Sequence, residues 1–407
     1  MLNDSIAAGS PLYPELFDAD YFGLMSDYPK FDYLRKQIVR VGEELSGKMV
    51  VAGDNSNLDH YREVFRIAYN WRNSHIYPMR RIHHELMANV RQRGVKLQGF
   101  TSARLKRMQS IREKLGESST KFDQMQDLGG CRAIMDSVDE YRQLIAKYRE
   151  GGTGHRIRND TDYFEKPRAS GYRGHHFVLE FQPEANEYQH KDRRIEVQLR
   201  TGLQHAWATA VEAVGIMRRE NMKRGIGDPD WLRLFALMST DFAIEEDGAH
   251  VPGTPEGKRE RHQELRHLND KLNAVVFLEN INQAFDYAPV YRGSAKFYLV
   301  QIDRDKKEVH VTGYNQPINA TEGFSASETG NGVISVLAEV NKIEDLMKAF
   351  PNYFMDVQMF TDHLKTIVFP DRAHKVAKSA AESVRATKKK SSNFLDLSWL
   401  KSYRPQR

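Results

Sequence analysis

The sequence has few of the features that mark secreted or membrane proteins. Its 407 residues include a single cysteine, Cys131, which excludes an internal disulfide and favours a reducing compartment. No uninterrupted apolar run approaches the roughly 20 residues that a membrane-spanning helix requires. The first residues, Met1 to Pro14, lack a basic segment followed by a long apolar stretch. We therefore expect a cytoplasmic protein with no membrane partner.

The net charge of the chain is also small. The chain has 60 Lys and Arg against 55 Asp and Glu, a net charge of +5, and a pI near 9.0. This balance fits a polyanionic partner such as a nucleotide or RNA, although the dense basic runs of a general nucleic-acid coat are missing. The positions of the basic residues are therefore more informative than their number.

The length predicts several domains, because single cores usually split beyond roughly 250 to 300 residues. Short β-rich runs alternate with helical ones between residues 100 and 220, which predicts an α+β fold: a mixed sheet flanked by helices. We expect a helical region before it and a second, smaller α/β domain after it. The predicted units are an N-terminal arm and helix (1–60), the main domain (61–222), a helical linker (223–290), the small domain (291–370) and a basic tail (371–407).

Local patterns predict individual elements. Apolar spacing indicates two helices between residues 59 and 93, broken near Pro78. Composition predicts a Gly/Ser/Thr-rich loop from Thr321 to Gly332. The strands that we expect are Gly130–Met135, His176–Phe181, Ile195–Leu199, a hairpin formed by Lys296–Ile302 and Glu308–Gly313, and Val333–Val340.

A basic cluster lies in the segment TSARLKRMQSIREKL, residues 101–115. Several cations within a turn or two of one another can hold a triphosphate. The alternative is a solvated helix face on which Ser110 and Glu113 form a capping box. The cations of the cluster are Arg104, Lys106, Arg107, Arg112 and Lys114.

Two acids stand next to buried strands. Asp127 opens DLGGCRAIM, where Gly129 and Gly130 let a ligand approach the backbone. Alternation in RIEVQLRT puts Glu196 on the polar face of its strand. Carboxylates in such positions suit Mg²⁺ bridging phosphates. The alternatives are a turn-forming aspartate and an edge strand with one wet face.

A glycine loop lies between the two acids, in DYFEKPRASGYRGHH, residues 162–176. Tyr172 follows Gly171 directly, so a mobile loop could offer its ring to a base while neighbouring cations meet phosphate. The alternative is a plain turn at Pro167 and Gly171. His175 and His176 lack cysteine partners and HExxH spacing, which disfavours zinc.

Together, these four pieces resemble the synthetase domain of the RelA/SpoT family, over roughly Thr101 to Glu212. The resemblance rests on the ordered set rather than on any one motif. It implies a nucleotidyltransferase-like sheet, and no HD-type hydrolase segment precedes it. The matching motifs are RxKxxxSIxxKL from Arg104, DLxGxR from Asp127, DYxxxPxxxGYxxxH from Asp162 and IExQxRTxxxH from Ile195.

The resemblance implies a reaction and a role for each matching residue. A ribose 3′-oxygen attacks the β-phosphorus of ATP, and AMP leaves. Asp127 and Glu196 would bind Mg²⁺, and Glu196 could also take the proton of the attacking hydroxyl. The implied ATP ligands are Arg104 and Arg132 around the adenine, and Lys106, Ser110 and Lys114 on the phosphates.

The acceptor side carries the departures from the family pattern. Arg173 and Gly174 replace the usual Gln-Ser after the stacking tyrosine, and Arg168 stands where lysine is common. These changes leave the identity of the acceptor open. The implied acceptor-binding residues are Tyr172, which would stack on the base, and Arg168, His176, Gln198 and Arg200.

A second resemblance concerns the small domain. FPNYFMD, residues 350–356, looks like the YPNYF segment of CapRel-type fused toxin-antitoxin proteins. In those proteins an aromatic pair occupies the ATP site of the same chain until a phage protein binds. The corresponding regulatory residues here would be Phe350 and Tyr353. The alternative is that both rings are simply core.

Two classes of function follow. The first is an ATP-dependent pyrophosphokinase. Its acceptor would be the tRNA 3′ CCA end, as in toxic relatives that act in phage defence, or GDP/GTP, as in alarmone synthetases. The second is a catalytically inactive sensor that binds nucleotide or a phage protein. Retention of both Asp127 and Glu196 favours the enzyme, because a pure binder needs neither acid.

Overall fold

The computed structural model describes most of the chain between residues 28 and 370. The described residues are 28–47, 58–90, 99–184, 187–283, 286–287, 295–303, 305–306, 308–328, 333–340, 346, 350 and 357–370.

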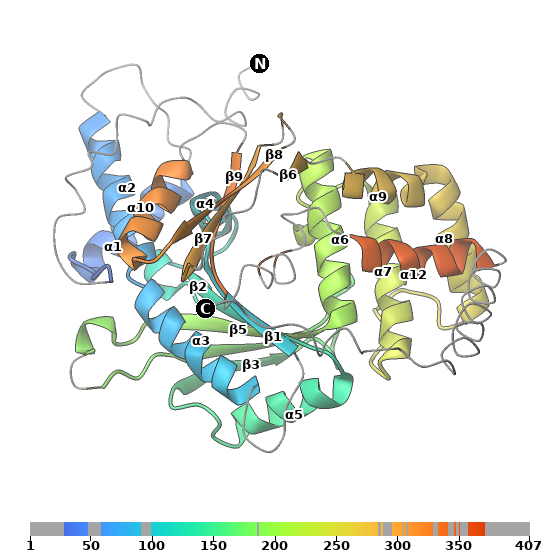
Figure 1. Cartoon of the computed structure of the whole chain (residues 1–407), viewed down its shortest axis with the longest axis horizontal. Coiled ribbons are helices and arrows are strands. Elements are labelled where there is room, and N and C mark those ends of the chain that lie inside the picture. Colours follow the sequence, from blue (N-terminus) through green and yellow to red (C-terminus); the bar gives the residue numbers. More distant parts are fainter. Residues whose placement is uncertain are drawn as a thin grey trace, which may run out of the picture.

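One mixed sheet runs through the centre of the molecule (Figure 1). The strand order is β3-β4-β5-β2-β1-β9-β7-β8-β6. The β2/β5 and β6/β8 pairs are parallel, and the other neighbours are antiparallel. The strands are β1 (Gly99–Leu105), β2 (Gly129–Met135), β3 (Arg156–Asp162), β4 (His175–Glu180), β5 (Arg194–Thr201), β6 (Asp286–Tyr287), β7 (Phe297–Asp303), β8 (Glu308–Tyr314) and β9 (Val333–Glu339).

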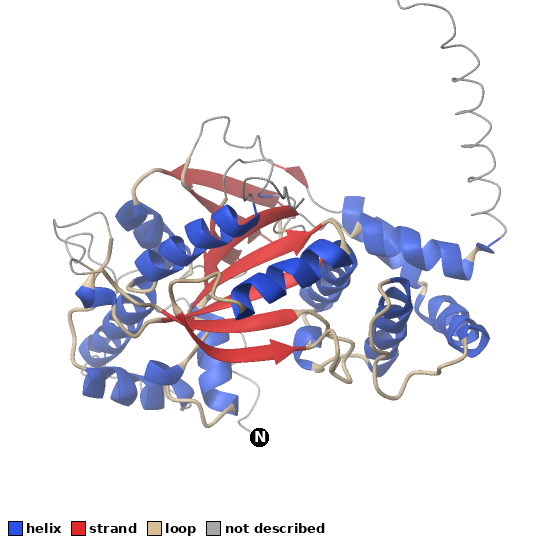
Figure 2. Ribbon diagram, turned by 90° about the horizontal axis from the view of Figure 1, so that it is seen from below, coloured by secondary structure: helices blue, strands red, loops and turns tan. Residues whose placement is uncertain are grey.

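Helices flank the sheet, as Figure 2 shows from a second direction. Helices α7, α8, α9 and α12 group together at one side of the molecule in both views, and α6 lies between them and the sheet. The helices are α1 (Arg35–Ser46), α2 (Leu58–Asn73), α3 (Ile76–Val90), α4 (Met108–Glu117), α5 (Val138–Arg149), α6 (Gly202–Arg218), α7 (Pro229–Glu245), α8 (Lys258–Leu272), α9 (Ala274–Gln283), α10 (Pro317–Ser327) and α12 (Gln358–Val368).

The two faces of the sheet bury different cores. On one face, Ala103, Cys131 and Val197 pack with residues of α3, α5 and α10. On the other face, Val300 and Val336 pack with residues of α6, α7, α8, α9 and α12. Alternation along each strand separates the two sets, because successive side chains point to opposite faces.

The helices α6 and α7 begin at strong local signals. The side chain of Thr201 caps α6 and accepts a hydrogen bond from the backbone N–H of Gln204. The side chain of Gln204 in turn accepts a hydrogen bond from the backbone N–H of Thr201. Asp228 caps α7, and Pro229 occupies its first turn, where no intrahelical donor is needed. Of the two helices, α6 begins directly after β5, one of the strands that carry the polar motifs.

The structure confirms the expected α+β class and the strands and hairpin predicted from alternation. The loop predicted for Thr321 to Gly332 was wrong over its first part, because α10 continues to Ser327. The two helices predicted between residues 59 and 93 are α2 and α3. The break predicted near Pro78 lies at Ser74 and His75, and Pro78 itself sits in the first turn of α3, where proline is tolerated.

The predicted small domain does not form a separate sheet. Its strand β9 pairs with β1, with Ala103 opposite Glu339 and Arg104 opposite Ala338. Glu339 is buried and accepts an ion pair from Arg80 of α3 at 3.3 Å. The C-terminal strands therefore extend the sheet that carries the polar motifs, while the predicted domain boundaries themselves stay predictions.

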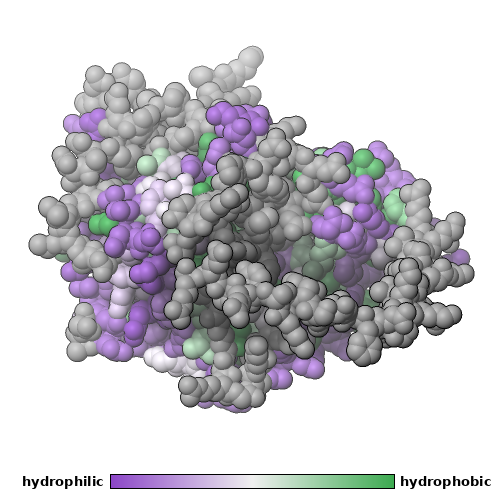
Figure 3. All heavy atoms as spheres, in the orientation of Figure 1, coloured by the Kyte–Doolittle hydropathy of each residue, from purple (hydrophilic) through white to green (hydrophobic). Residues whose placement is uncertain are grey.

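The surface agrees with the composition. On the face drawn in Figure 3, hydrophilic residues form most of the described surface, with smaller hydrophobic areas between them. Within the described ranges, no helix combines the length and the apolar character needed to cross a membrane.

Candidate active site

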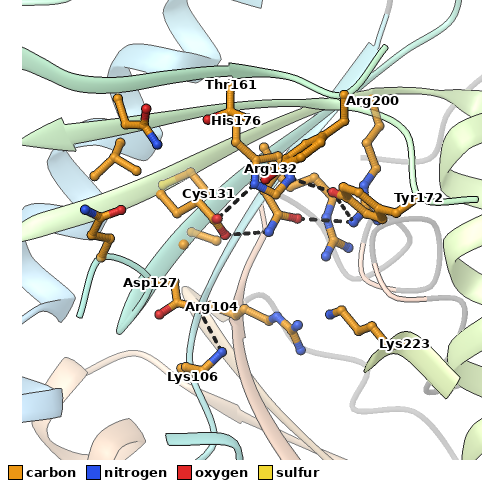
Figure 4. A pocket seen from close by; sticks show the side chains of 18 of the residues that line it. Arg104, Lys106, Asp127, Cys131, Arg132, Thr161, Tyr172, His176, Arg200 and Lys223 are labelled. Carbon is orange, nitrogen blue, oxygen red and sulfur yellow. Dashed lines mark hydrogen bonds and ion pairs between the residues drawn. The ribbon is translucent and has the colours of Figure 1, made fainter. Parts of the chain in front are cut away.

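A cavity of about 410 Å³ opens on the polar face of β1, β2, β4 and β5 (Figure 4). This volume lies in the range of small-molecule sites. Seven lysines and arginines line it against two acids, which makes it suited to a polyanionic ligand. The charged lining residues are Arg104, Lys106, Lys114, Asp127, Arg132, Arg168, Glu196, Arg200 and Lys223.

Asp127 lies just before β2, at the edge of the cavity. Its Oδ2 accepts ion pairs from Lys106 Nζ at 2.9 Å and Lys114 Nζ at 3.0 Å. Its Oδ1 is buried and has no hydrogen-bond partner among the described residues. Lys106 and Lys114 come from the end of β1 and from α4, so the carboxylate joins the two ends of the basic segment. One oxygen remains available for a further ligand.

Glu196 projects from β5 into the same cavity, where Gly130 of β2 is its partner in the parallel ladder. His176 Nδ1 lies 2.9 Å from Glu196 Oε1, and Gln198 Nε2 donates to Oε2 at 2.5 Å. Burial opposes ionisation of Glu196, but His176 and Gln198 together with Lys106 lower its pKa well below the usual range. The carboxylate is therefore ionised at neutral pH.

His176 is held between an acid and a phenol. Its Nε2 is hydrogen-bonded to the Tyr172 hydroxyl at 2.5 Å. Burial acts to lower the pKa of His176, but Tyr172 and Glu196 outweigh it and raise the pKa to about 9. The imidazole is accordingly a cation at neutral pH, oriented on Glu196.

Tyr172 lines the cavity, and both its hydroxyl and its ring contact other side chains. Arg200 Nη2 donates to this hydroxyl at 3.2 Å. Tyr163 and Trp207 meet the ring edge-on, at centroid distances of 5.5 and 6.3 Å. Burial raises the pKa of Tyr172, but Arg200 and His176 reverse this and lower it to about 7. The stacking predicted for Tyr172 stays a prediction.

Two arginines of adjacent strands lie near an aromatic ring from the C-terminal part. The Phe350 ring centroid lies 6.0 Å from Arg104 Cζ and 5.7 Å from Arg132 Cζ, at the range of a cation–π contact. Phe350 is 1 % exposed and lines the cavity. Tyr353, the second predicted regulatory residue, lies outside the described residues.

The structure brings nearly all predicted site residues together. Ser110 is the exception: it is in the first turn of α4 and is not among the residues lining the cavity. The basic cluster spans the strand β1 and the helix α4. The alternative capping box of Ser110 and Glu113 was wrong, because the helix starts at Met108.

Sequence reasoning missed Lys223, which lines the cavity, and its charged neighbour Glu212, which does not. Lys223 reaches the cavity from the short helical turn Met222–Arg224, and Figure 4 draws it with Arg104 between it and Asp127. Burial opposes ionisation of Glu212, but Lys223 and Arg104 lower its pKa to about 2. No motif contains Lys223, because only the α6–α7 connection brings it to the cavity.

Asp127 and Glu196 fit a magnesium ion. Mg²⁺ typically takes one or two carboxylates and completes its shell with water and substrate phosphates. The orphaned Oδ1 of Asp127 and the ionised carboxylate of Glu196 are the oxygens that would contribute to such a shell. The surrounding cations suit the phosphates that would share the ion.

Comparison with known proteins finds a family match over the same part of the chain. Residues 103–219 match the family model described as the region found in RelA / SpoT proteins. No curated protein matches the chain. The matched segment contains the end of β1 and all of β2, β4 and β5, and therefore most of the cavity lining.

Several solved structures are similar to part of the chain. One is the small alarmone synthetase 1 from Bacillus subtilis bound to its product pppGpp, with 20% identity, a TM-score of 0.36, and 44% of this chain and 93% of that chain covered. Another is a GTP pyrophosphokinase family protein from Streptococcus pneumoniae, with 22% identity, a TM-score of 0.36 and coverage of 44% and 87%. Like these structures, the family model matches only part of the chain, from residue 103 to residue 219.

Proposed function

We propose that this protein transfers the β,γ-pyrophosphate of ATP to a ribose 3′-hydroxyl. The observation that carries the proposal is the single cavity in which Asp127 and Glu196 meet the Arg104, Lys106 and Lys114 cluster. Charge neutralisation around phosphorus is the main demand of such a transfer, and this lining supplies it. A bound magnesium ion would add further neutralisation of the phosphates.

The step itself needs few protein groups. The 3′-oxygen forms a bond to the β-phosphorus, the bond from that phosphorus to the α–β bridging oxygen breaks, and AMP leaves with the electron pair. The hydroxyl proton passes to Glu196, which His176 and Gln198 hold in place. Lys106 and Lys114 would bind the transferred phosphates, and Arg104 and Arg132 the adenine.

We further propose that the C-terminal part inhibits the enzyme. Phe350 lies between Arg104 and Arg132, where the RelA/SpoT resemblance puts the adenine of ATP. A buried ring in that position excludes the base by volume. Release would require a partner of the C-terminal part, and a phage protein is the partner that the CapRel resemblance suggests.

For the acceptor we propose the 3′ CCA end of tRNA, with GDP or GTP as the alternative. The cation excess of the cavity favours a polyanion but suits both. The tRNA version makes the protein a toxin that blocks translation, and the guanosine version makes it an alarmone synthetase.

One labelling experiment tests these proposals. The protein and its Phe350→Ala variant are incubated with γ-labelled ATP and Mg²⁺, together with GDP, GTP, bulk tRNA, or tRNA whose 3′ cis-diol has been destroyed by periodate. We expect label on intact tRNA and none on oxidised tRNA. Label on GDP or GTP alone would establish the alarmone alternative, and ATP binding without transfer in any mixture would establish the inactive sensor.

A further inference from the structure

The loop that carries Tyr172 is held by a buried ion pair between Arg173 and Glu246, on the side away from the cavity. Arg173 follows Tyr172 directly but is not among the cavity-lining residues, and it is only 2 % exposed. Its Nη1 donates to Glu246 Oε2 at 2.8 Å, and its guanidinium lies 4.9 Å from the ring centroid of Phe164. Arg173 therefore turns away from the acceptor side and toward α7.

Glu246 connects three elements through one carboxylate. It is the residue at which α7 ends, and it is 5 % exposed. Besides Arg173, it accepts hydrogen bonds from Thr201 Oγ1 and from Gln204 Nε2, the latter at 3.3 Å. Thr201 and Gln204 begin α6, directly after the strand that carries Glu196 and Gln198. The carboxylate thus ties the Tyr172 loop to that strand as well as to α7.

A second contact anchors the same loop two residues earlier. Ser239 Oγ of α7 donates to the carbonyl oxygen of Gly171 at 2.6 Å. Gly171 has a φ of 95°, and a Cβ there would lie 2.8 Å from Trp207 Cζ2 and 3.2 Å from Ala236 Cα. Only glycine allows this close approach to α6 and α7.

We propose that Arg173 and Glu246 are positioning residues for the acceptor, acting through Tyr172. This inference rests on the proposed pyrophosphate transfer. Tyr172 stands between the two anchored residues Gly171 and Arg173, so the anchors determine where its hydroxyl meets His176 and Arg200. Arg173, which replaces the glutamine of the family pattern, orients the acceptor loop and makes no contact with the acceptor itself.

The test separates acceptor binding from ATP binding. In Arg173→Met and Glu246→Gln, we expect the KM for the acceptor to rise by about 10- to 100-fold, the size of effect that a small misplacement produces. The KM for ATP should stay essentially unchanged. The double variant should lose no more than the worse single variant, because both changes break one interaction. Arg173→Lys, which retains the charge, should restore part of the loss.

The Arg233–Glu264 pair provides the control. It also involves α7, with Nε to Oε1 at 2.6 Å, but it joins α7 to α8 and not to the acceptor loop. Arg233→Met should leave both KM values unchanged. Equal rises in the two KM values for Arg173→Met, or a loss of thermal stability with an unchanged acceptor KM, would overturn the inference.

A second readout needs no enzymatic activity. Displacement of Tyr172 changes how its ring meets Tyr163 and Trp207, so the ring resonances of Tyr172 should shift in NMR spectra of Arg173→Met but not in those of Arg233→Met. If no variant or parent transfers label, the proposed function fails, and these resonances still decide the positioning role. Unchanged Tyr172 resonances in Arg173→Met refute it.

Discussion

The two halves of the single sheet show how the same architecture serves chemistry in one place and packing in another. On the face that carries the cavity, β1 and β5 present Arg104 and Glu196, whereas β7 and β9 present Val300 and Val336 to the helices. The change falls between two paired strands, where Arg104 is opposite Ala338. Polar side chains are tolerated on this face only where helices leave it open to a ligand.

The largest effect should come from the half that carries the chemistry. Glu196→Gln removes the charge but retains the shape, so transfer should fall by at least about 100-fold while ATP binding is largely kept. Pyrophosphate transfer and ATP calorimetry measure the two properties. Glu150→Gln, at an exposed residue after α5, is the matched control. An active Glu196→Gln enzyme would contradict the assigned role.

The next prediction concerns Phe350, the residue of the C-terminal part that lines the cavity. Phe350→Ala removes the ring between Arg104 and Arg132, so basal transfer and ATP affinity should rise by about tenfold or more, since the adenine no longer competes with a buried aromatic. Phe350→Tyr retains a ring and should stay near the parent activity. Unchanged basal turnover in Phe350→Ala would rule out inhibition by this contact.

The pairing of β1 with β9, which joins the two halves of the sheet and includes Glu339, gives a stability prediction. Burial acts to raise the pKa of Glu339, but the neighbouring His83 and His84, together with Arg80, lower it to about 2. Its stabilising contribution should be complete above the usual glutamate pKa of about 4.3 and be lost as the pH falls toward 2.

Glu339→Gln should therefore cost about 1 to 3 kcal/mol at neutral pH. The difference from the parent should shrink in acid, and denaturant unfolding at several pH values measures it. Glu308→Gln, on a half-exposed side chain of β8, is the control. If the difference in free energy of unfolding does not depend on pH, the charge of Glu339 does not stabilise the pairing of β1 with β9.

The smallest expected change is a titration within the cavity. Because the folded pKa of His176 is raised to about 9, its ion pair with Glu196 should stabilise the fold fully below the ordinary histidine pKa of about 6.5 and weaken as the pH rises through 9. NMR of the imidazole measures the midpoint. Glu196→Gln should lower it, and a midpoint near 6.5 in the parent would contradict this charge pairing.

The sequence alone was sufficient where the signal is local. Alternation in RIEVQLRT placed Glu196 and Gln198 on one face. The RelA/SpoT resemblance selected Arg104, Lys106 and Lys114 from the basic segment, and all three line the cavity. The sequence was insufficient where the local composition favours a loop but packing against the sheet favours a helix. The segment from Pro317 to Ser327 is rich in turn-forming residues but is helical, because Ala320 and Phe324 bury one side of it against the sheet.

Thus the sequence determined the class of fold from its alternating patterns, and its motifs, through the family that they resemble, named most of the residues that line the candidate site. Only tertiary structure decided which distant groups meet. Phe350 between two arginines, Arg173 on Glu246 and Lys223 at the cavity are contacts between segments far apart in the chain. No periodicity encodes such contacts, since they depend on how the helices pack on the sheet.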